Sequence, residues 1–127
     1  MIEFKDVGVD VDEYDVEGHH RRVTILSGVN VTVPERRVAV VGPNGAGKSP
    51  LLKLVNGLMA ATSGTVTVDG IDPKFDGKAA RRRVGYIFTN PMSQLVMSTP
   101  VADVELSLRQ RIRNRTERHD AALKILA

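Results

Sequence analysis

The chain has 127 residues, of which 42% are hydrophobic and 26% charged, proportions typical of one globular domain with a core. The absence of cysteine excludes disulfides, cysteine-ligated zinc and iron–sulfur clusters, and His19, His20 and His119 do not repeat at a metal-ligand spacing. No apolar run is long enough to span a membrane or to act as a signal region, so we expect a cytoplasmic protein. The net charge of +3 is unevenly distributed, since residues 1–20 carry seven acids and one lysine whereas residues 78–127 carry ten bases and four acids.

Alternating apolar residues predict two half-buried strands near the N-terminus, over 2–11 and over 29–33, where Pro34 follows the second. The intervening segment DEYDVEGHHRR, at 12–22, is mostly charged and shows no periodicity. We therefore expect 12–22 to be an exposed hairpin connection.

An unbroken apolar run, VAVV at 38–41, predicts a strand that is covered on both faces. A glycine-rich stretch follows it directly. Apolar residues from Leu51 to Leu58 then repeat at helical spacing, and Asn56-Gly57 supplies a helix stop. The sequence thus predicts strand, loop and helix in immediate succession.

The remainder of the chain predicts two more strands and two more helices, separated by turn and proline signals. No internal repeat or low-complexity tract interrupts them. In chain order they are a strand at 65–68, a turn at Asp69-Gly70, a strand at 84–88, a loop between Pro91 and Pro100, a helix at 101–112, and a helix at 117–127 capped by Thr116.

Two basic clusters lie in the second half of the chain, at 81–83 and 109–115. Such clusters can bind nucleic acid, but none of the five aromatic residues lies inside them to stack on bases. We therefore expect no nucleic-acid partner. The clusters are interpreted as solvated helix faces, or as a surface near another subunit or anionic headgroups.

The stretch after the 38–41 strand satisfies the phosphate-loop pattern G-x-x-x-x-G-K-[ST] in the expected context of strand before and helix after. Glycines let backbone N–H groups turn inward around phosphate oxygens, and the helix N-terminus adds unpaired donors and the positive end of its dipole. Lys48 is expected to reach the β and γ phosphates as the catalytic cation, and the Ser49 hydroxyl to coordinate Mg²⁺. The nucleotide-binding residues predicted in this way are Gly42, Pro43, Asn44, Gly45, Ala46, Gly47, Lys48, Ser49 and Pro50.

Three stretches carry a resemblance to one family. GPNGAGKS at 42–49 resembles the Walker A loop of ABC-type ATPases, and TSGTVTVDG at 62–70 resembles the strand and turn found after the first helix in that family. RRRVGYIFTNPMSQLVMSTPVADVELSL, at 81–108, resembles the Q-loop region, and is most similar to ATPases of cobalt, nickel or biotin importers of the energy-coupling-factor type. The resemblance runs from Ile2 to Ala127.

The resemblance implies an α/β fold, the P-loop NTPase fold of ABC ATPase type in incomplete form. Residues 1–100 would be the N-terminal part of the ATPase core, and 101–127 the start of the helical subdomain. The implied function is that of the ATP-binding half of an importer ATPase, with ATP and Mg²⁺ as cofactors. A second ATPase subunit would complete a dimer, and a transmembrane subunit would dock on residues 89–100, at the inner face of the cell membrane. A non-catalytic nucleotide-binding or degenerate interaction module is the alternative.

The sequence departs from the family pattern at two positions that meet the nucleotide. Val11 stands where the family stacks adenine on a ring; Tyr14 either substitutes for that ring or is a solvated turn tyrosine. Thr89 stands where the family has the Q-loop glutamine. Gln94 resembles a second glutamine of the subgroup, and is either a further metal contact or an ordinary loop residue. The apolar residues of the same loop are either docking contacts or core packing: Met92, Leu95, Val96 and Met97.

Two further departures lower the expected activity. Pro50 replaces a threonine whose N–H and hydroxyl point to the α-phosphate in the family, so both donors are lost, although proline is compatible with the first turn of a helix. The family's signature loop, Walker B carboxylates and switch histidine do not occur within the 127 residues. We therefore expect weak nucleotide binding without turnover, and self-association through an apolar strand edge at 38–41.

Overall fold

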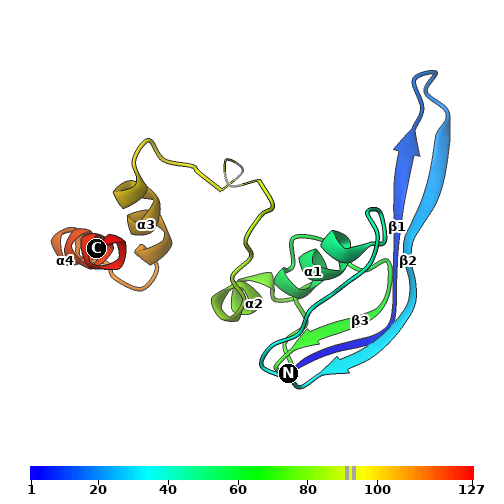
Figure 1. Cartoon of the computed structure of the whole chain (residues 1–127), viewed down its shortest axis with the longest axis horizontal. Coiled ribbons are helices and arrows are strands. Elements are labelled where there is room, and N and C mark those ends of the chain that lie inside the picture. The colour runs from blue at the N-terminus through cyan, green and yellow to red at the C-terminus, as the bar shows by residue number, and fades with distance from the viewer. Residues whose placement is uncertain (91, 93) are drawn as a thin grey trace. The chain divides into compact units, whose positions relative to one another are not determined.

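The computed structural model describes residues 1–90, 92 and 94–127. The chain forms two compact units, Met1–Tyr86 and Ile87–Ala127. Pro91, expected to open the docking loop, lies outside the described residues. The elements in chain order are β1 (Ile2–Tyr14), β2 (His20–Val33), α1 (Lys48–Asn56), β3 (Ser63–Val68), α2 (Gly77–Arg83), α3 (Pro100–Leu108) and α4 (Arg115–Leu126) (Figure 1).

The first unit contains a three-stranded antiparallel sheet in the order β2-β1-β3. Phe4 in the central strand lies opposite Val31 of β2 and Val66 of β3, which fixes the register on both sides. The predicted strands at 2–11, 29–33 and 65–68 are confirmed. Alternation of apolar residues was sufficient to find them because one face of this sheet is covered by the core.

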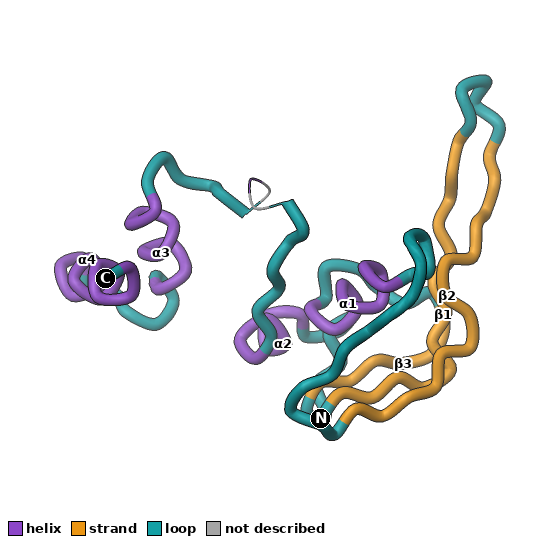
Figure 2. Tube along the Cα trace, in the orientation of Figure 1, coloured by secondary structure: helices purple, strands orange, loops and turns teal. Residues whose placement is uncertain are grey.

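The predicted exposed hairpin connection at 12–22 is confirmed as exposed and as part of a hairpin, but its extent is wrong, because β1 and β2 continue through most of it as a two-stranded arm beyond β3 (Figures 1 and 2). Only residues 15–19 form the turn. The arm is held by cross-strand charge pairs, each an acid of β1 with a base of β2: Asp10 Oδ2 with Arg22 Nη2 at 3.0 Å, Asp12 Oδ1 with His20 Nε2 at 2.8 Å, and Glu13 Oε2 with Arg21 Nη2 at 2.9 Å.

Helix α1 packs on the sheet and contributes two residues to the small core. Leu54 and Val55 of α1 are buried, together with Phe4, Val7 and Val9 of β1. The predicted helix stop is confirmed, since Gly57 adopts a left-handed conformation with φ of 74° and donates its N–H to Leu54 O. The side chain of the buried Asn56 donates to Val84 O at 2.9 Å, which ties the end of α1 to the segment after α2.

The predicted strands at 38–41 and 84–88 are absent from the structure. Val38, Val40 and Val41 are 55%, 42% and 87% exposed, and Ile87 is 86% exposed. A strand requires a hydrogen-bonding neighbour, and in the described part of the chain the strands β1, β2 and β3 pair only with one another. Residues 34–47 therefore run as a loop from β2 to α1 (Figure 2).

Helix α2 was missed because its sequence GKAARRR contains no apolar periodicity. Its start is set by Asp76, whose side chain accepts the N–H of Ala79, and Ala80 anchors it in the interior. Arg83 in its last turn donates to Asp69, which also accepts the N-terminal amine at 2.6 Å. The hydrogen bond and the charge of that amine, reinforced by Arg83, lower the pKa of Asp69.

The second unit contains two helices, α3 and α4, that pack against each other. Thr99 caps α3 through the N–H of Ala102, and α3 ends at Leu108 rather than at 112. The predicted cap of the last helix is wrong, because Asn114 accepts the N–H of Glu117 and α4 begins at Arg115, which places Thr116 inside the helix. No helix among the described residues is long and apolar enough to cross a membrane.

The exposed valines of the 38–41 segment predict self-association of the isolated chain, because apolar side chains beside unpaired backbone groups favour pairing with another chain. Val41→Lys should shift the distribution toward monomer in sedimentation velocity. Val16→Lys is the matched control, since Val16 is fully exposed in the hairpin turn at 106% and lies apart from the segment. A monodisperse wild-type monomer would contradict this prediction.

Candidate phosphate-binding site

The loop that enters α1 has the geometry of an anion site. Gly45 and Gly47 have φ angles of 84° and 79°, and a turn is closed by the Ala46 N–H donating to Pro43 O at 3.3 Å. Within the described chain, the N–H groups of Gly45, Gly47, Lys48 and Ser49 have no hydrogen-bond partner. Adjacent free N–H groups at the start of a helix form a concave donor surface that suits a phosphate.

Gly47 fixes this loop to the sheet. It is the one fully buried residue of the 42–50 stretch, and a Cβ built on it would stand 2.6 Å from Leu26 Cδ2 of β2. Both its left-handed conformation and this contact require glycine. The role of Leu26 was not predicted from sequence, because a leucine in an alternating strand gives no indication that a loop packs on it.

Lys48 lies at the first position of α1 with its side chain folded onto the loop. Its Nζ donates to Gly42 O at 2.7 Å and to Pro43 O at 2.6 Å. These contacts hold the ammonium group at the mouth of the donor surface. The predicted contact of Lys48 with the phosphates remains a prediction; its present partners are neutral carbonyls, which are weaker acceptors than charged phosphate oxygens.

Ser49 and Pro50 occupy the first turn of α1, and the helix forms despite the proline. The first hydrogen bond into the helix is donated by Leu51 to Gly47 O at 2.9 Å, so the N–H that Pro50 lacks is one that has no partner within the helix. The Ser49 side chain is exposed, which leaves its hydroxyl accessible to an ion bound with the phosphates. Pro43, Asn44 and Ala46 are also exposed in the loop.

The two candidate base-stacking positions lie at different distances along the arm. Leu26, on which Gly47 packs, is paired with Val9, whereas Tyr14 is paired with His20 at the end of β1. Tyr14 is therefore five residues beyond Val9, or about 17 Å along the strand, and Val11 only about 7 Å. The Tyr14 ring is 70% exposed and contacts the His20 ring at a centroid distance of 5.3 Å.

Gln94 and Thr89 belong to the second unit. The side-chain amide of Gln94 donates to Phe88 O at 3.4 Å, and Thr89 is exposed. The metal contact predicted for Gln94 remains a prediction.

The only group of three potential metal-ligand side chains among the described residues lies elsewhere, in the hairpin turn. It consists of Asp15, Glu17 and His19, whose ligand atoms lie within 4.8 Å of one another and are all exposed. Backbone hydrogen bonds from His19 lower the pKa of Asp15, which keeps that carboxylate ionised. These side chains bond to one another and define the turn rather than the phosphate loop.

A helix start with free N–H donors, a lysine at its first position and a sheet packed against the helix give this α/β protein the arrangement that is typical of a phosphate-binding loop. Comparison with known proteins gives the family. A family model described as ABC transporter matches residues 26–126, and the chain accordingly belongs to the ABC transporter family of ATP-binding proteins.

The chain is similar to several curated members of that family. A putative ABC transporter ATP-binding protein of Bartonella quintana is 45% identical over 83 residues, which are 65% of this chain and 36% of that protein. A cobalt import ATP-binding protein of Syntrophus aciditrophicus is 38% identical over 107 residues, which are 82% of this chain and 36% of that protein. The chain thus spans little more than a third of the curated relatives that it matches.

Solved structures confirm the fold class predicted from the sequence. A dimeric ATP-binding cassette in a post-hydrolysis state, bound to ADP and phosphate, superposes with a TM-score of 0.80 at 26% identity, covering 98% of this chain and 55% of that one. The ABC ATPase fold is therefore shown for the part of the cassette that this chain represents.

Proposed function

We propose that the loop at 42–50 binds MgATP, and that the protein is the ATP-holding part of an importer ATPase whose transported substrate is a metal ion or a vitamin. The observation that carries the proposal is the set of unpartnered N–H groups of Gly45, Gly47, Lys48 and Ser49 in the loop onto which the Lys48 ammonium group folds. The cobalt import relative and a biotin transport ATP-binding protein of Rhodobacter capsulatus, 36% identical over 87 residues, support the importer type.

The docking surface for a transmembrane subunit is proposed at residues 89–100, which join the ATPase core at 1–100 to the helical subdomain that starts at 101. The apolar side chains of this loop are exposed, at 70% for Met92, 57% for Leu95 and 73% for Val96, which supports docking rather than core packing. Asp103 of α3 accepts the N–H groups of Val96 and Met97 at 3.1 and 2.9 Å, so the loop presents these side chains in a fixed conformation.

The proposal is tested by equilibrium titration of the whole chain with a fluorescent ATP analogue, with and without Mg²⁺. Mg²⁺ should tighten binding to the wild type by roughly tenfold, since its bond to the Ser49 hydroxyl adds one charged contact. Ser49→Ala should lose the Mg²⁺ effect and keep the metal-free affinity. Ser107→Ala, in the second unit, is the control. Equal affinity with and without Mg²⁺ in the wild type would contradict the proposal that the Ser49 hydroxyl coordinates Mg²⁺.

Pro50→Thr should increase the affinity for the same analogue by roughly tenfold to a hundredfold, because the substitution restores one or two hydrogen-bond donors to a charged phosphate. The control is Pro50→Val, which restores the backbone N–H without the hydroxyl and so separates the two donors. An unchanged affinity for the threonine variant would show that the nucleotide does not contact this position.

The alternative function, a nucleotide-binding module without catalysis, is favoured by Pro50 in particular. It predicts that the complete protein binds the ATP analogue but releases no phosphate. Steady-state phosphate release by the complete protein distinguishes the two functions.

A further inference from the structure

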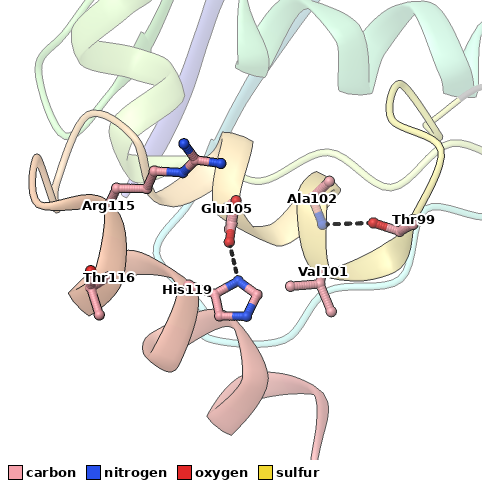
Figure 3. Close-up of a pocket in the computed structure, with 7 residues that line it drawn as sticks. All are labelled: Thr99, Val101, Ala102, Glu105, Arg115, Thr116 and His119. Carbon is pink, nitrogen blue, oxygen red and sulfur yellow. Dashed lines mark hydrogen bonds and ion pairs between the residues drawn. The ribbon is translucent and has the colours of Figure 1, made fainter.

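The pocket between α3 and α4 has no part in the nucleotide site, and its size is that of a ligand pocket. It encloses about 490 Å³, within the range of about 300 to 1,000 Å³ that is common for small-molecule sites. Val101 and Ala102 of α3 form an apolar wall, and Arg115, Thr116 and His119 of α4 contribute polar groups (Figure 3).

The one acid in the pocket is already paired. Glu105 Oε1 lies 2.5 Å from His119 Nδ1, and this contact joins α3 to α4. One oxygen of the Glu105 carboxylate therefore has a hydrogen-bond partner within the pocket. Because Nδ1 faces Glu105, Nε2 is the ring nitrogen that remains for a ligand.

Arg115 is the cation of the pocket that has no partner. It is exposed, and it makes no ion pair or hydrogen bond through its side chain with the described residues. Its side chain and that of His119 both lie toward Glu105 in Figure 3. A guanidinium group offers two parallel N–H donors, the arrangement that fits the oxygens of a phosphate or carboxylate.

The connector between the two helices adds positive charge beside the pocket. Arg109, Arg111 and Arg113 are exposed, and no acid lies between them. Arg118 holds the connector in place, since its Nη1 donates to Ile112 O at 3.0 Å and to Arg113 O at 3.4 Å. The surroundings therefore favour an anion of more than one charge.

We propose that this pocket binds a phosphate ester, with the Arg115 guanidinium, the Thr116 hydroxyl and, in the protonated form of the ring, the Nε2–H of His119 as donors. A tetrahedral phosphate offers oxygens to three donors of different direction, whereas a planar carboxylate uses the guanidinium alone. The ester is either the headgroup of an anionic phospholipid or a small soluble phosphate. The site is independent of the loop at 42–50.

The test uses the full chain and two probes, glycerol 1-phosphate in solution and vesicles of phosphatidylglycerol in phosphatidylcholine. Glycerol 1-phosphate should shift the amide signals of residues 99–119 and the ring signals of His119 in NMR titration, separately from those of Gly45 and Gly47. Arg115→Gln should weaken this response about fivefold to tenfold. Arg81→Gln, which removes the same charge from an exposed arginine of α2, should leave it unchanged.

The vesicles identify the source of the phosphate. Cosedimentation with phosphatidylglycerol vesicles that is reduced by Arg115→Gln, and not by Arg81→Gln, supports a lipid headgroup. Response to glycerol 1-phosphate without vesicle binding supports a small soluble ester. The proposal is overturned if neither probe affects residues 99–119, or if both variants weaken binding equally, which would indicate general attraction to a basic protein.

Discussion

Lys48→Ala should lower the affinity for an ATP analogue by roughly 10- to 100-fold, because the substitution removes a charged donor to the phosphates. Lys48 Nζ donates to Gly42 O and Pro43 O, which keeps the ammonium group on the loop that carries the free N–H donors. To bind the phosphates, the ammonium group therefore only has to exchange these two carbonyl oxygens for phosphate oxygens. The effect should be larger than that of any other single side chain of the loop.

The control for this prediction is Lys53→Ala, which removes the same charge from the last turn of the same helix. Its affinity should match that of the wild type, and far-UV circular dichroism should show α1 intact in both variants. Equal affinities for Lys48→Ala and the wild type would remove the basis of the nucleotide-site proposal. Equal losses of affinity in Lys48→Ala and Lys53→Ala would show that the effect comes from the net charge of the protein and not from the position of Lys48.

Gly64→Ala should lower the free energy of unfolding by about 3 kcal/mol, because two costs coincide at this position. Gly64 is the second residue of β3 and has a φ of 70°, a conformation that costs a residue with a Cβ about 1 to 2 kcal/mol. A Cβ there would also stand 2.2 Å from the backbone oxygen of Asp6, which cannot move without breaking the pairing of β1 with β3.

Gly70→Ala separates these two costs. Gly70 has a φ of 80° but nothing within 4 Å of the added Cβ, so it should lose only the conformational part. Chemical denaturation followed by circular dichroism measures both variants. Similar losses for Gly64→Ala and Gly70→Ala would show that β1 yields at Asp6 and that the close approach is not a constraint.

The sequence indicated those elements whose signals are local. The strands at 2–11, 29–33 and 65–68 alternate, and Lys48 to Gly57 contains helical spacing with a glycine stop, so each could be found from its own residues. The continuation of both strands through 12–22 was missed because the indication for it is the match between charges on two strands, and not a pattern within either strand. Taken separately, the acids of β1 and the bases of β2 do not indicate strands. They become complementary once the register of the hairpin is known, in which Asp10 lies opposite Thr24 and Asp12 opposite Arg22.

The segments at 38–41 and 84–88 show the opposite error. Their apolar residues indicated buried strands, but burial of a strand depends on what lies beside it rather than on its own composition. In the described chain β1 is paired on both sides along its first half, and the segments remain as exposed loops. The phosphate loop was predicted well because its motif specifies backbone conformation directly, whereas the contact between Gly47 and Leu26 depends on tertiary structure.

The two carbonyl contacts of Lys48 also affect how strongly nucleotides with different numbers of phosphates are expected to bind. A ligand gains from the ammonium group only what exceeds its two contacts with Gly42 O and Pro43 O. The oxygens of a triphosphate tail carry full charge and outcompete neutral carbonyls, whereas a monophosphate seated on the N–H donors alone leaves Lys48 where it is. Under the proposed function, the loop would therefore distinguish nucleotides by the length of their phosphate chain, and AMP would gain less from Lys48 than ATP does.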